Sequence, residues 1–316
     1  MGKTIVLTRR RNLIVAGLFT AASAVVAFWS ATTLAAPNTR LSASCDIVFS
    51  SWFNYSELKN PFADKPADDE LDGLVSTSVP FSLNSIYHAY SNGIFSWGDD
   101  GHTAVWYSPP LRGVLTFDHL HVSKSYKKWA RKNTQNHEDQ SHYITTPTGD
   151  KKPKYEVRFN TDFQQTVRNA FKAHSSASTD ADAIDDLETW ITSGYMESAF
   201  KLHRLGMAKS VEVWNNQTEQ MVGGLYGFFI DGVFAGESMF SFEANTSKMA
   251  FYALVERLKA KGHTFIDIQQ VIEPYEDEAG NQIEPGGVTF YLGGENIPRD
   301  DFLDRLRKQQ SRRLPF

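Results

Sequence analysis

Apolar positions alternate with strand spacing in the last third of the chain. An apolar run over 221–229 returns through 233–240, and Asp231 and Gly232 stand at the turn between them. An Asp-Gly pair between two apolar runs is the strongest short-range signal for a β-hairpin. The shorter run 263–269 predicts another strand.

Polar side chains interrupt these apolar strands at three positions. Asp267 and Gln269 are two residues apart, and alternate side chains of a strand face the same side. We therefore expect this carboxylate and this amide to point together into one place. Glu237 stands toward the far end of the hairpin's return strand and adds a second carboxylate.

Helical spacing of apolar residues predicts most of the remaining elements. The predicted helices cover residues 83–93, 123–132, 161–173, 195–205 and 247–261, and short strands are expected around 104–106 and 113–117. Glycines at 93, 206 and 262 are expected to end three of the helices. Strands, then a helix, then the strand with Asp267 favour a mixed sheet, so the predicted fold class is α/β, of the α+β kind.

The first 36 residues have a different pattern. Residues 13–36 are uncharged and mostly apolar, and Lys3 and the arginines at 9–11 precede them. This layout is typical of a signal peptide or of a single membrane anchor whose basic end stays in the cytoplasm. A buried N-terminal helix and a misassigned start codon are the other two interpretations. Residues 37–82, which include the acidic run 68–72, are expected to form a linker or surface segment.

Composition narrows the class of protein only partly. With 316 residues, 41% of them hydrophobic, the chain can bury one large core or two modest ones, and its net charge of -5 points to no partner. A single cysteine, Cys45, excludes a disulfide framework and a thiolate metal cluster. His119 and His121 lack an obvious acidic partner, so we interpret them as surface or core residues and expect no metal.

A series of short motifs runs through the chain between about residues 83 and 306. They are Gly93-Ile94-Phe95-Ser96-Trp97, Trp106-Tyr107-Ser108-Pro109, Leu120-His121-Val122-Ser123-Lys124-Ser125, Thr189-Trp190-Ile191-Thr192, Leu202-His203-Arg204-Leu205-Gly206, Gly223-Gly224-Leu225-Tyr226-Gly227 and Ile297-Pro298-Arg299. In this order they resemble the leucyl/phenylalanyl-tRNA–protein transferases, which move an amino acid from a charged tRNA to the N-terminal amine of a protein. Chance is a poor explanation for so many blocks in one order.

The resemblance implies an architecture. A small N-terminal α/β domain at 83–154 is expected before a catalytic domain at 155–306, whose mixed sheet resembles that of the acetyltransferase superfamily, and residues 307–316 form a basic tail. Acetyl-CoA is disfavoured, because no glycine-rich pyrophosphate turn opens the helix that begins at Ser247. We expect no cofactor, and we expect a monomer.

The resemblance also assigns roles to the polar residues. Aminoacyl transfer needs a neutral amine, a stabilised oxyanion and a proton for the departing ribose oxygen. Asp267 and Gln269 match the family's Asp-x-Gln pair, so the carboxylate is implied to steer the proton and the amide to hold the oxyanion, with the ribose hydroxyl as an equal proton route. Glu237 is implied to bind the substrate's amino group or to orient its neighbours. An implied pocket for leucine, phenylalanine or methionine is lined by Leu225, Phe234, Met239 and Ile266.

The implied partners are aminoacyl-tRNA and a protein that begins with Arg or Lys. Trp97 and Trp190 match the tryptophans that hold the terminal adenosine in the family, and stacking suits any base; core packing is their alternative. A basic run interleaved with Tyr126 and Trp129 suits the phosphates of an acceptor stem near that stacking platform, or else forms a solvated helix face. Its cations are Lys124, Lys127, Lys128, Arg131 and Lys132.

Two departures from the family keep a second hypothesis open. Residues 271–288 form a longer, acidic insertion close in sequence to Asp267, and negative charge there repels phosphate. The apolar leader at 13–36 directs the chain to a membrane or across it, away from charged tRNA. The second hypothesis is a membrane-tethered or exported relative that has lost tRNA use and forms amides from another donor, or binds an apolar amino acid or peptide.

Overall fold

The computed structural model describes residues 57–99, 104–134, 142–174, 193–271, 275–276, 282–283 and 288–316. The apolar leader at 13–36, Cys45, Trp190 and most of the acidic insertion lie outside the described residues. Within the described ranges, no helix is long and apolar enough to cross a membrane. All of these ranges belong to one compact unit, residues 42–316.

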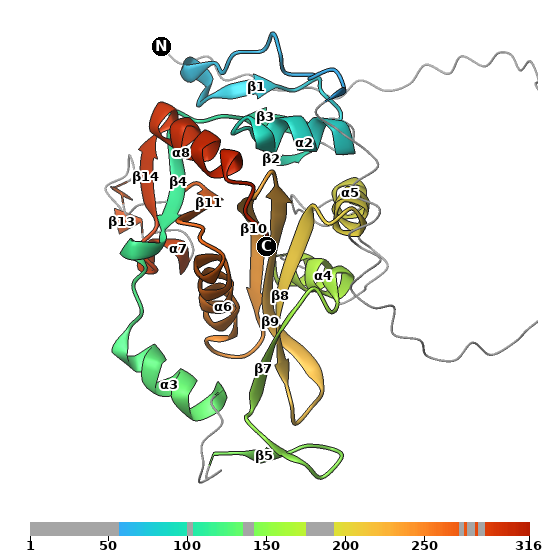
Figure 1. The fold of residues 1–316 in the computed structure, drawn as a ribbon, viewed down its shortest axis with the longest axis vertical. Coiled ribbons are helices and arrows are strands. Elements are labelled where there is room, and N and C mark those ends of the chain that lie inside the picture. The colour runs from blue at the N-terminus through green and yellow to red at the C-terminus, as the bar shows by residue number, and fades with distance from the viewer. Residues whose placement is uncertain are drawn as a thin grey trace, which may run out of the picture. The chain divides into compact units, whose positions relative to one another are not determined.

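A seven-stranded sheet forms the centre of the fold (Figure 1), with the strand order β14-β4-β11-β10-β9-β8-β7. Its strands are β4 (Leu111–Thr116), β7 (Tyr155–Phe159), β8 (Ala208–Asn215), β9 (Gln220–Ile230), β10 (Val233–Ser241), β11 (Phe265–Gln269) and β14 (Glu295–Pro298). Neighbouring strands are antiparallel except β10 and β11, which run parallel. Strand β4 comes from the segment 83–154, so this sheet contains strands from both segments that the sequence divided into domains.

The predicted hairpin is confirmed as β9 and β10. Asp231 and Gly232 form its turn, with φ of 50° and 77°, because two-residue turns need positive φ to match the twist of the strands. The Asp231 carboxylate accepts hydrogen bonds from the hydroxyls of Tyr87 and Ser91 in α2 (Leu83–Ser91). The turn is therefore tied to this helix.

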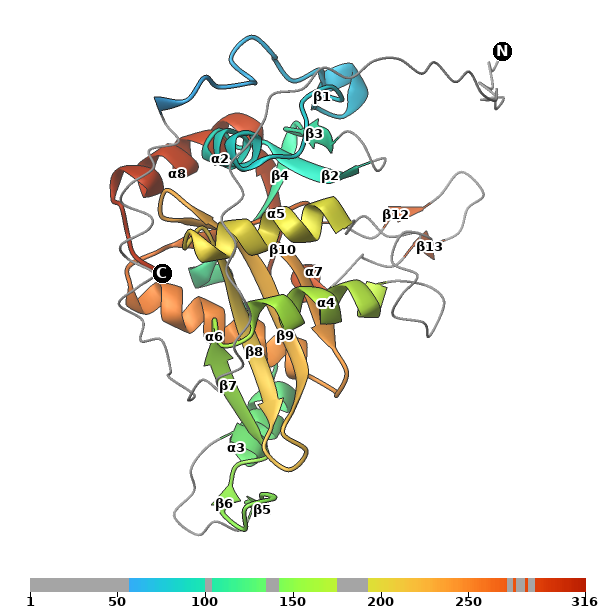
Figure 2. The same ribbon diagram turned by 90° about the vertical axis from the view of Figure 1, so that its right-hand side faces the viewer.

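Helices cover both faces of the large sheet (Figure 2). On one face, α4 (Phe163–His174) and α5 (Ser193–Arg204) pack against Tyr226 and Phe228 of β9. On the other face, α6 (Thr246–Ala260) packs against Leu225 of the same strand. Neighbouring residues of β9 thus enter two cores, as strand alternation requires. This arrangement confirms the predicted α+β class.

A smaller sheet with the order β1-β3-β2 lies beside α2 and α8 at one end of the described unit (Figure 1). Its strands are β1 (Leu74–Ser76), β2 (Phe95–Asp99) and β3 (Ala104–Tyr107), and α8 spans Arg299–Ser311. The other helices are α3 (Lys124–Thr134), α7 (Val288–Tyr291) and two short 3-10 helices, η2 (Asp69–Leu71) and η3 (Phe117–His119). Two short strand pairs remain: β5 (Ile144–Thr145) with β6 (Lys151–Lys152), and β12 (Tyr275–Glu276) with β13 (Gln282–Ile283).

The five predicted helices are confirmed within a few residues at each end. Gly93 and Gly206 follow two of them with φ of 73° and 74°, the left-handed conformation that ends helices. At the start of α6, Asn245 has φ of 69° and its side chain makes no capping hydrogen bond. The hydroxyl of Thr246 instead bonds backbone carbonyls of Val222 and Glu243.

Candidate active site

The parallel pairing of β10 and β11 is interrupted where the polar residues lie. Among the described residues, β10 and β11 pair at one position, where Ala235 lies opposite Asp267. Strand β10 has a register shift at Glu237, and β11 has one at Ile268. Such bulges bend a strand and redirect its side chains. Glu237 and Gln269 therefore follow the shared pair at a place where the backbones of the two strands are no longer paired.

Asp267 is paired with a buried arginine on β4. Arg112 donates from Nε to Oδ1 at 2.9 Å and from Nη2 to Oδ2 at 2.6 Å, and the two residues are only 1% and 3% exposed. Nη1 donates to the Gly93 carbonyl, and the guanidinium lies over the rings of Phe95 and Phe302. Both carboxylate oxygens are engaged within the protein. Sequence reasoning did not find this pair, although an arginine inside an apolar strand was an available signal.

Gln269 has a left-handed backbone. Its φ is 64°, and the Gln270 N–H donates to the Ile268 carbonyl at 2.7 Å, which closes a three-residue turn around Gln269. The Gln269 N–H donates to Asp267 Oδ1 at 2.9 Å. Such backbone strain costs on the order of 1–3 kcal/mol and concentrates at functional sites. Gly113 of β4 accommodates the turn, since a Cβ there would lie 2.7 Å from the Gln270 backbone.

This turn changes the geometry expected from the sequence. The shared face of Asp267 and Gln269 was argued from regular strand alternation, which the bulge at Ile268 interrupts. Gln269 instead extends its amide across to β10, where Nε2 donates to Glu237 Oε1 at 2.8 Å. The three predicted polar residues are connected through Gln269, whose backbone bonds one carboxylate and whose side chain bonds the other.

Glu237 receives donors from three elements. Besides Gln269, Tyr90 of α2 donates to Oε1 at 2.7 Å and Tyr195 of α5 donates to Oε2 at 2.6 Å. Burial raises the pKa of Glu237 to about 7, the two tyrosine hydrogen bonds oppose that rise, and the charged pair of β4 and β11 contributes in both directions. Glu237 therefore changes protonation near neutral pH. Tyr90 and Tyr195 could not be identified from the sequence, because helical spacing alone assigns them to the core.

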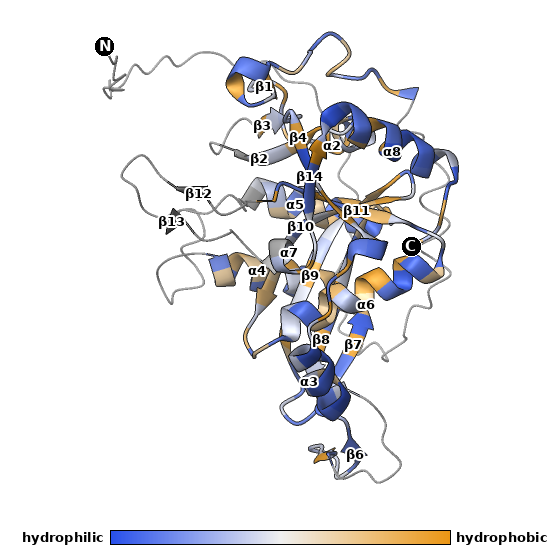
Figure 3. Ribbon diagram, turned by 90° about the vertical axis from the view of Figure 1, so that its left-hand side faces the viewer, coloured by the Kyte–Doolittle hydropathy of each residue, from blue (hydrophilic) through white to orange (hydrophobic). Residues whose placement is uncertain are grey.

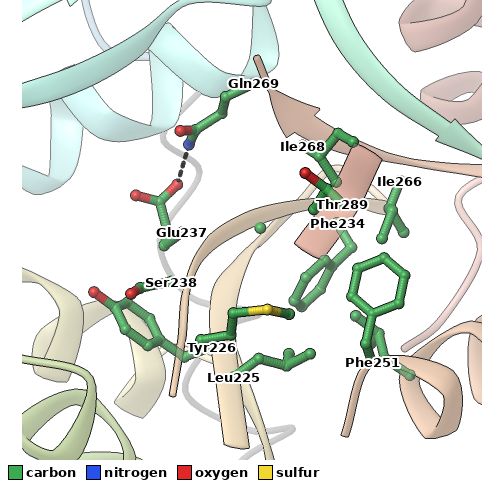
Figure 4. A pocket seen from close by; sticks show the side chains of 13 residues that line it. Leu225, Tyr226, Phe234, Glu237, Ser238, Phe251, Ile266, Ile268, Gln269 and Thr289 are labelled. Atoms are coloured by element: carbon green, nitrogen blue, oxygen red, sulfur yellow. Dashed lines mark hydrogen bonds between the residues drawn. The ribbon is translucent and has the colours of Figure 1, made fainter. Parts of the chain in front are cut away.

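An apolar cavity of about 140 Å³ lies beside this polar cluster (Figure 4). Its lining includes all four residues predicted for the pocket, Leu225, Phe234, Met239 and Ile266. Phe251 and Leu254 of α6 complete the apolar wall and were not predicted. Glu237 and Gln269 form its polar end, on the opposite side from the rings of Phe234 and Phe251 in Figure 4. A dry cavity of about 150 Å³ binds benzene, so this one is large enough for the side chain of leucine or phenylalanine.

Trp97 is on the surface of β2. It is 44% exposed, and its ring contacts those of Phe95 and Tyr107. Such exposure does not fit the core-packing alternative for this residue. Trp190 is outside the described residues, so its position relative to Trp97 stays a prediction.

The predicted basic helix is α3, and Figure 3 shows it as a hydrophilic element. Tyr126 and Trp129 hold it against the protein through ring contacts with Tyr252 and Tyr155. All five predicted cations are exposed: Lys124, Lys127, Lys128, Arg131 and Lys132. The basic run is not beside Trp97, because α3 and β2 lie at opposite ends of the described unit in Figures 1 to 3.

The fold and site define an α+β protein with an apolar pocket that ends in a carboxyl–amide pair. Residues 114–307 match the family model described as leucyl/phenylalanyl-tRNA protein transferase. The leucyl/phenylalanyl-tRNA–protein transferase of Flavobacterium psychrophilum is 36% identical over 237 residues, which cover 75% of this chain and 92% of the relative. That of Pseudomonas syringae pv. tomato is 33% identical over 256 residues, which cover 81% of this chain and 92% of the relative. The chain belongs to the leucyl/phenylalanyl-tRNA–protein transferase family.

Among solved structures, L-PGS from Bacillus licheniformis matches with a TM-score of 0.29 and 11% identity, over 58% of this chain and 48% of that one.

Proposed function

We propose that this chain transfers leucine, phenylalanine or methionine from aminoacyl-tRNA to the N-terminal amine of a protein that begins with arginine or lysine. Membership of the family supports the proposal. The observation that carries it is the apolar cavity whose polar end is formed by Glu237 and Gln269. A substrate side chain in the cavity leaves the α-amino group and the ester carbonyl beside these two residues.

The cavity sets a broad selectivity. Its apolar walls are side chains of three strands and α6, and Tyr226, Ser238 and Thr289 add hydroxyl groups to the lining. Apolar pockets separate similar side chains by only about 1–3 kcal/mol per methylene. Leucine, phenylalanine and methionine are therefore all expected as donors.

The reaction joins the acceptor nitrogen to the aminoacyl carbonyl carbon and breaks the ester bond to the ribose. The amine loses a proton and the ribose oxygen gains one, either through the site or through the neighbouring ribose hydroxyl. The Gln269 amide is suited to hold the oxyanion, because it is a donor fixed beside the cavity. Once Gln269 donates to substrate, Glu237 can accept from the substrate's α-ammonium.

Two surface features are assigned to the RNA in this proposal. Trp97, together with Trp190, supplies the stacking surface for the terminal adenosine, and the exposed cations of α3 contact phosphates. Because α3 and β2 are at opposite ends of the described unit, one RNA molecule has to extend between them. The phosphates at α3 then belong to the acceptor stem and not to the single-stranded end.

We place the catalytic part of the chain on the cytoplasmic side, because charged tRNA is the donor. An anchor at 13–36 with its basic end inside would put the residues after 36 outside, so in this proposal that segment does not span the membrane in that orientation. Fractionation of cells that contain the full chain, with protease added to intact spheroplasts, tests the side. Digestion of the catalytic part from outside would favour the exported relative.

A transfer assay tests the reaction itself. Labelled leucine or phenylalanine is supplied on tRNA to the purified full chain, with a protein that begins with Arg as acceptor. We expect transfer by the wild-type chain and its loss in Asp267→Ala. Folded wild-type protein that transfers neither amino acid would overturn the proposal.

A further inference from the structure

Arg112 differs from the other arginines whose ion pairs the structure describes, because both partners of its pair are buried. The side chains of Arg112 and Asp267 are 1% and 5% exposed, whereas those of Arg158 and Glu156 are 37% and 46% exposed. Replacing a buried ion pair with apolar residues of similar volume is often neutral or stabilising. Stability alone is therefore a weak reason for a charged pair at this place.

The surroundings of Arg112 allow its guanidinium little freedom. All three nitrogens donate hydrogen bonds, two to Asp267 and one to the Gly93 carbonyl. The rings of Phe95 and Phe302 lie 4.4 Å and 4.8 Å from the guanidinium carbon. A planar fork held in this way fixes the position of both carboxylate oxygens.

The fixed carboxylate in turn holds Gln269. Asp267 Oδ1 accepts from Arg112 Nε and also from the Gln269 N–H at 2.9 Å. That second bond stabilises a left-handed residue, which otherwise favours an extended backbone. In a regular extended strand Gln269 would face the same side as Asp267, without the turn from which its amide reaches Glu237.

We propose that Arg112 is a positioning residue for aminoacyl transfer. It orients Asp267, and Asp267 holds Gln269 in the turn that aims the amide at Glu237 and at the polar end of the cavity. The predicted effect of Arg112 on catalysis rests on the proposed function. Its structural part, the dependence of the Gln269 turn on Arg112, can be measured without any reaction.

The test replaces Arg112 with lysine in the full chain. Lysine keeps the charge but cannot form the two parallel bonds to Asp267. We expect kcat for transfer to fall by about 10- to 100-fold, as for a small misplacement of a catalytic group, with less change in KM for aminoacyl-tRNA. We also expect faster hydrogen exchange of the Gln269 backbone N–H, measured by NMR, while the backbone N–H groups of β9 keep their protection.

The matched control is Arg299→Lys. Arg299 also bonds a carboxylate, that of Asp69, and a backbone carbonyl, that of Pro109, but it contacts none of the polar residues of the site. We expect this variant to keep the wild-type kcat and the wild-type exchange at Gln269.

A second variant covers the case in which Arg112→Lys does not fold. Arg112→Met combined with Asp267→Leu removes both charges, so no buried charge is left unpaired. We expect a folded protein with fast exchange at Gln269 and little transfer. Slow exchange at Gln269 in either variant overturns the proposal, as does a wild-type kcat per folded molecule. If the wild-type chain itself transfers nothing, the proposed function fails, and the exchange measurement still decides whether Arg112 holds the turn.

Discussion

Gln269 and Glu237 bond to each other directly, from Nε2 to Oε1 at 2.8 Å, just past the point where the parallel pairing of β10 and β11 ends. When a substrate binds, the hydrogen bond between these two groups is replaced by bonds from each group to the substrate. A substrate ammonium that binds Glu237 frees the amide of Gln269, and an oxyanion that binds Gln269 frees Glu237. Binding of the α-amino group and stabilisation of the oxyanion are therefore coupled in this site.

Glu237 is expected to make stability depend on pH. Burial raises its folded-state pKa to about 7, above the ordinary value of 4.5, so the folded protein binds this proton more tightly than the unfolded chain. Its contribution to the free energy of unfolding is full below about pH 4.5 and falls as pH rises to about 7. In Glu237→Gln, the fall in the free energy of unfolding across this pH range should be smaller by on the order of 1–3 kcal/mol. Urea unfolding of both proteins below and above this window measures the difference, and equal declines would contradict the assignment.

Leu225 should control which amino acid is transferred. It is 3% exposed and lines the cavity, so Leu225→Phe reduces the space for a substrate side chain. We expect the ratio of phenylalanine to leucine transfer to fall by about tenfold, because phenylalanine needs more of that space. Leu202→Phe is the control, since Leu202 is buried in α5 and does not line the cavity. A ratio that changes equally in both variants would argue against the cavity as the substrate pocket.

Trp97 should contribute to binding of the tRNA end and little to stability. Its side chain is 44% exposed, so Trp97→Ala removes a stacking surface without opening a core cavity. We expect KM for aminoacyl-tRNA to rise by about tenfold, in line with about 1–3 kcal/mol per stacked base. Trp97→Phe keeps a stacking ring and should recover most of the affinity. An unchanged KM in Trp97→Ala would remove Trp97 from the RNA site.

The cations of α3 should make binding of tRNA depend on salt. Lys127 and Lys128 are exposed, and a double substitution by alanine should weaken binding at every salt concentration. The slope of log affinity against log salt should become shallower by about one for each phosphate that the variant no longer neutralises. Lys201→Ala is the control, because Lys201 pairs with Glu197 on α5. An unchanged salt slope in the double variant would exclude α3 from the phosphate-binding surface.

Local patterns predicted the elements but not the bonds between them. The Asp231-Gly232 turn, the helices and the four pocket residues follow from short-range rules and from the family resemblance. The pair of Arg112 and Asp267 joins residues far apart in the chain, and no local rule links them. The resemblance pointed to Asp267 and Gln269, whereas Arg112, which bonds Asp267, lies in β4.

The left-handed conformation of Gln269 shows why strand alternation was insufficient. A bulge cannot be read from the spacing of Ile266, Asp267 and Ile268, which is that of a regular strand. It results from the hydrogen bond of the Gln269 N–H to Asp267 and from the space beside Gly113. Both depend on tertiary contacts, so the geometry of the site could be stated only from the structure.

The most direct test of aminoacyl transfer at this site is single-turnover transfer of labelled phenylalanine from tRNA to a peptide that begins with arginine. The same peptide with an acetylated N-terminus is the control for the acceptor amine, and Gln269→Ala is compared with the wild-type chain. We predict transfer to the free amine alone, and a rate in Gln269→Ala that is lower by about 100- to 1,000-fold, the effect of losing one oxyanion donor. Transfer at the wild-type rate by Gln269→Ala, or no transfer by folded wild-type protein, would contradict the account.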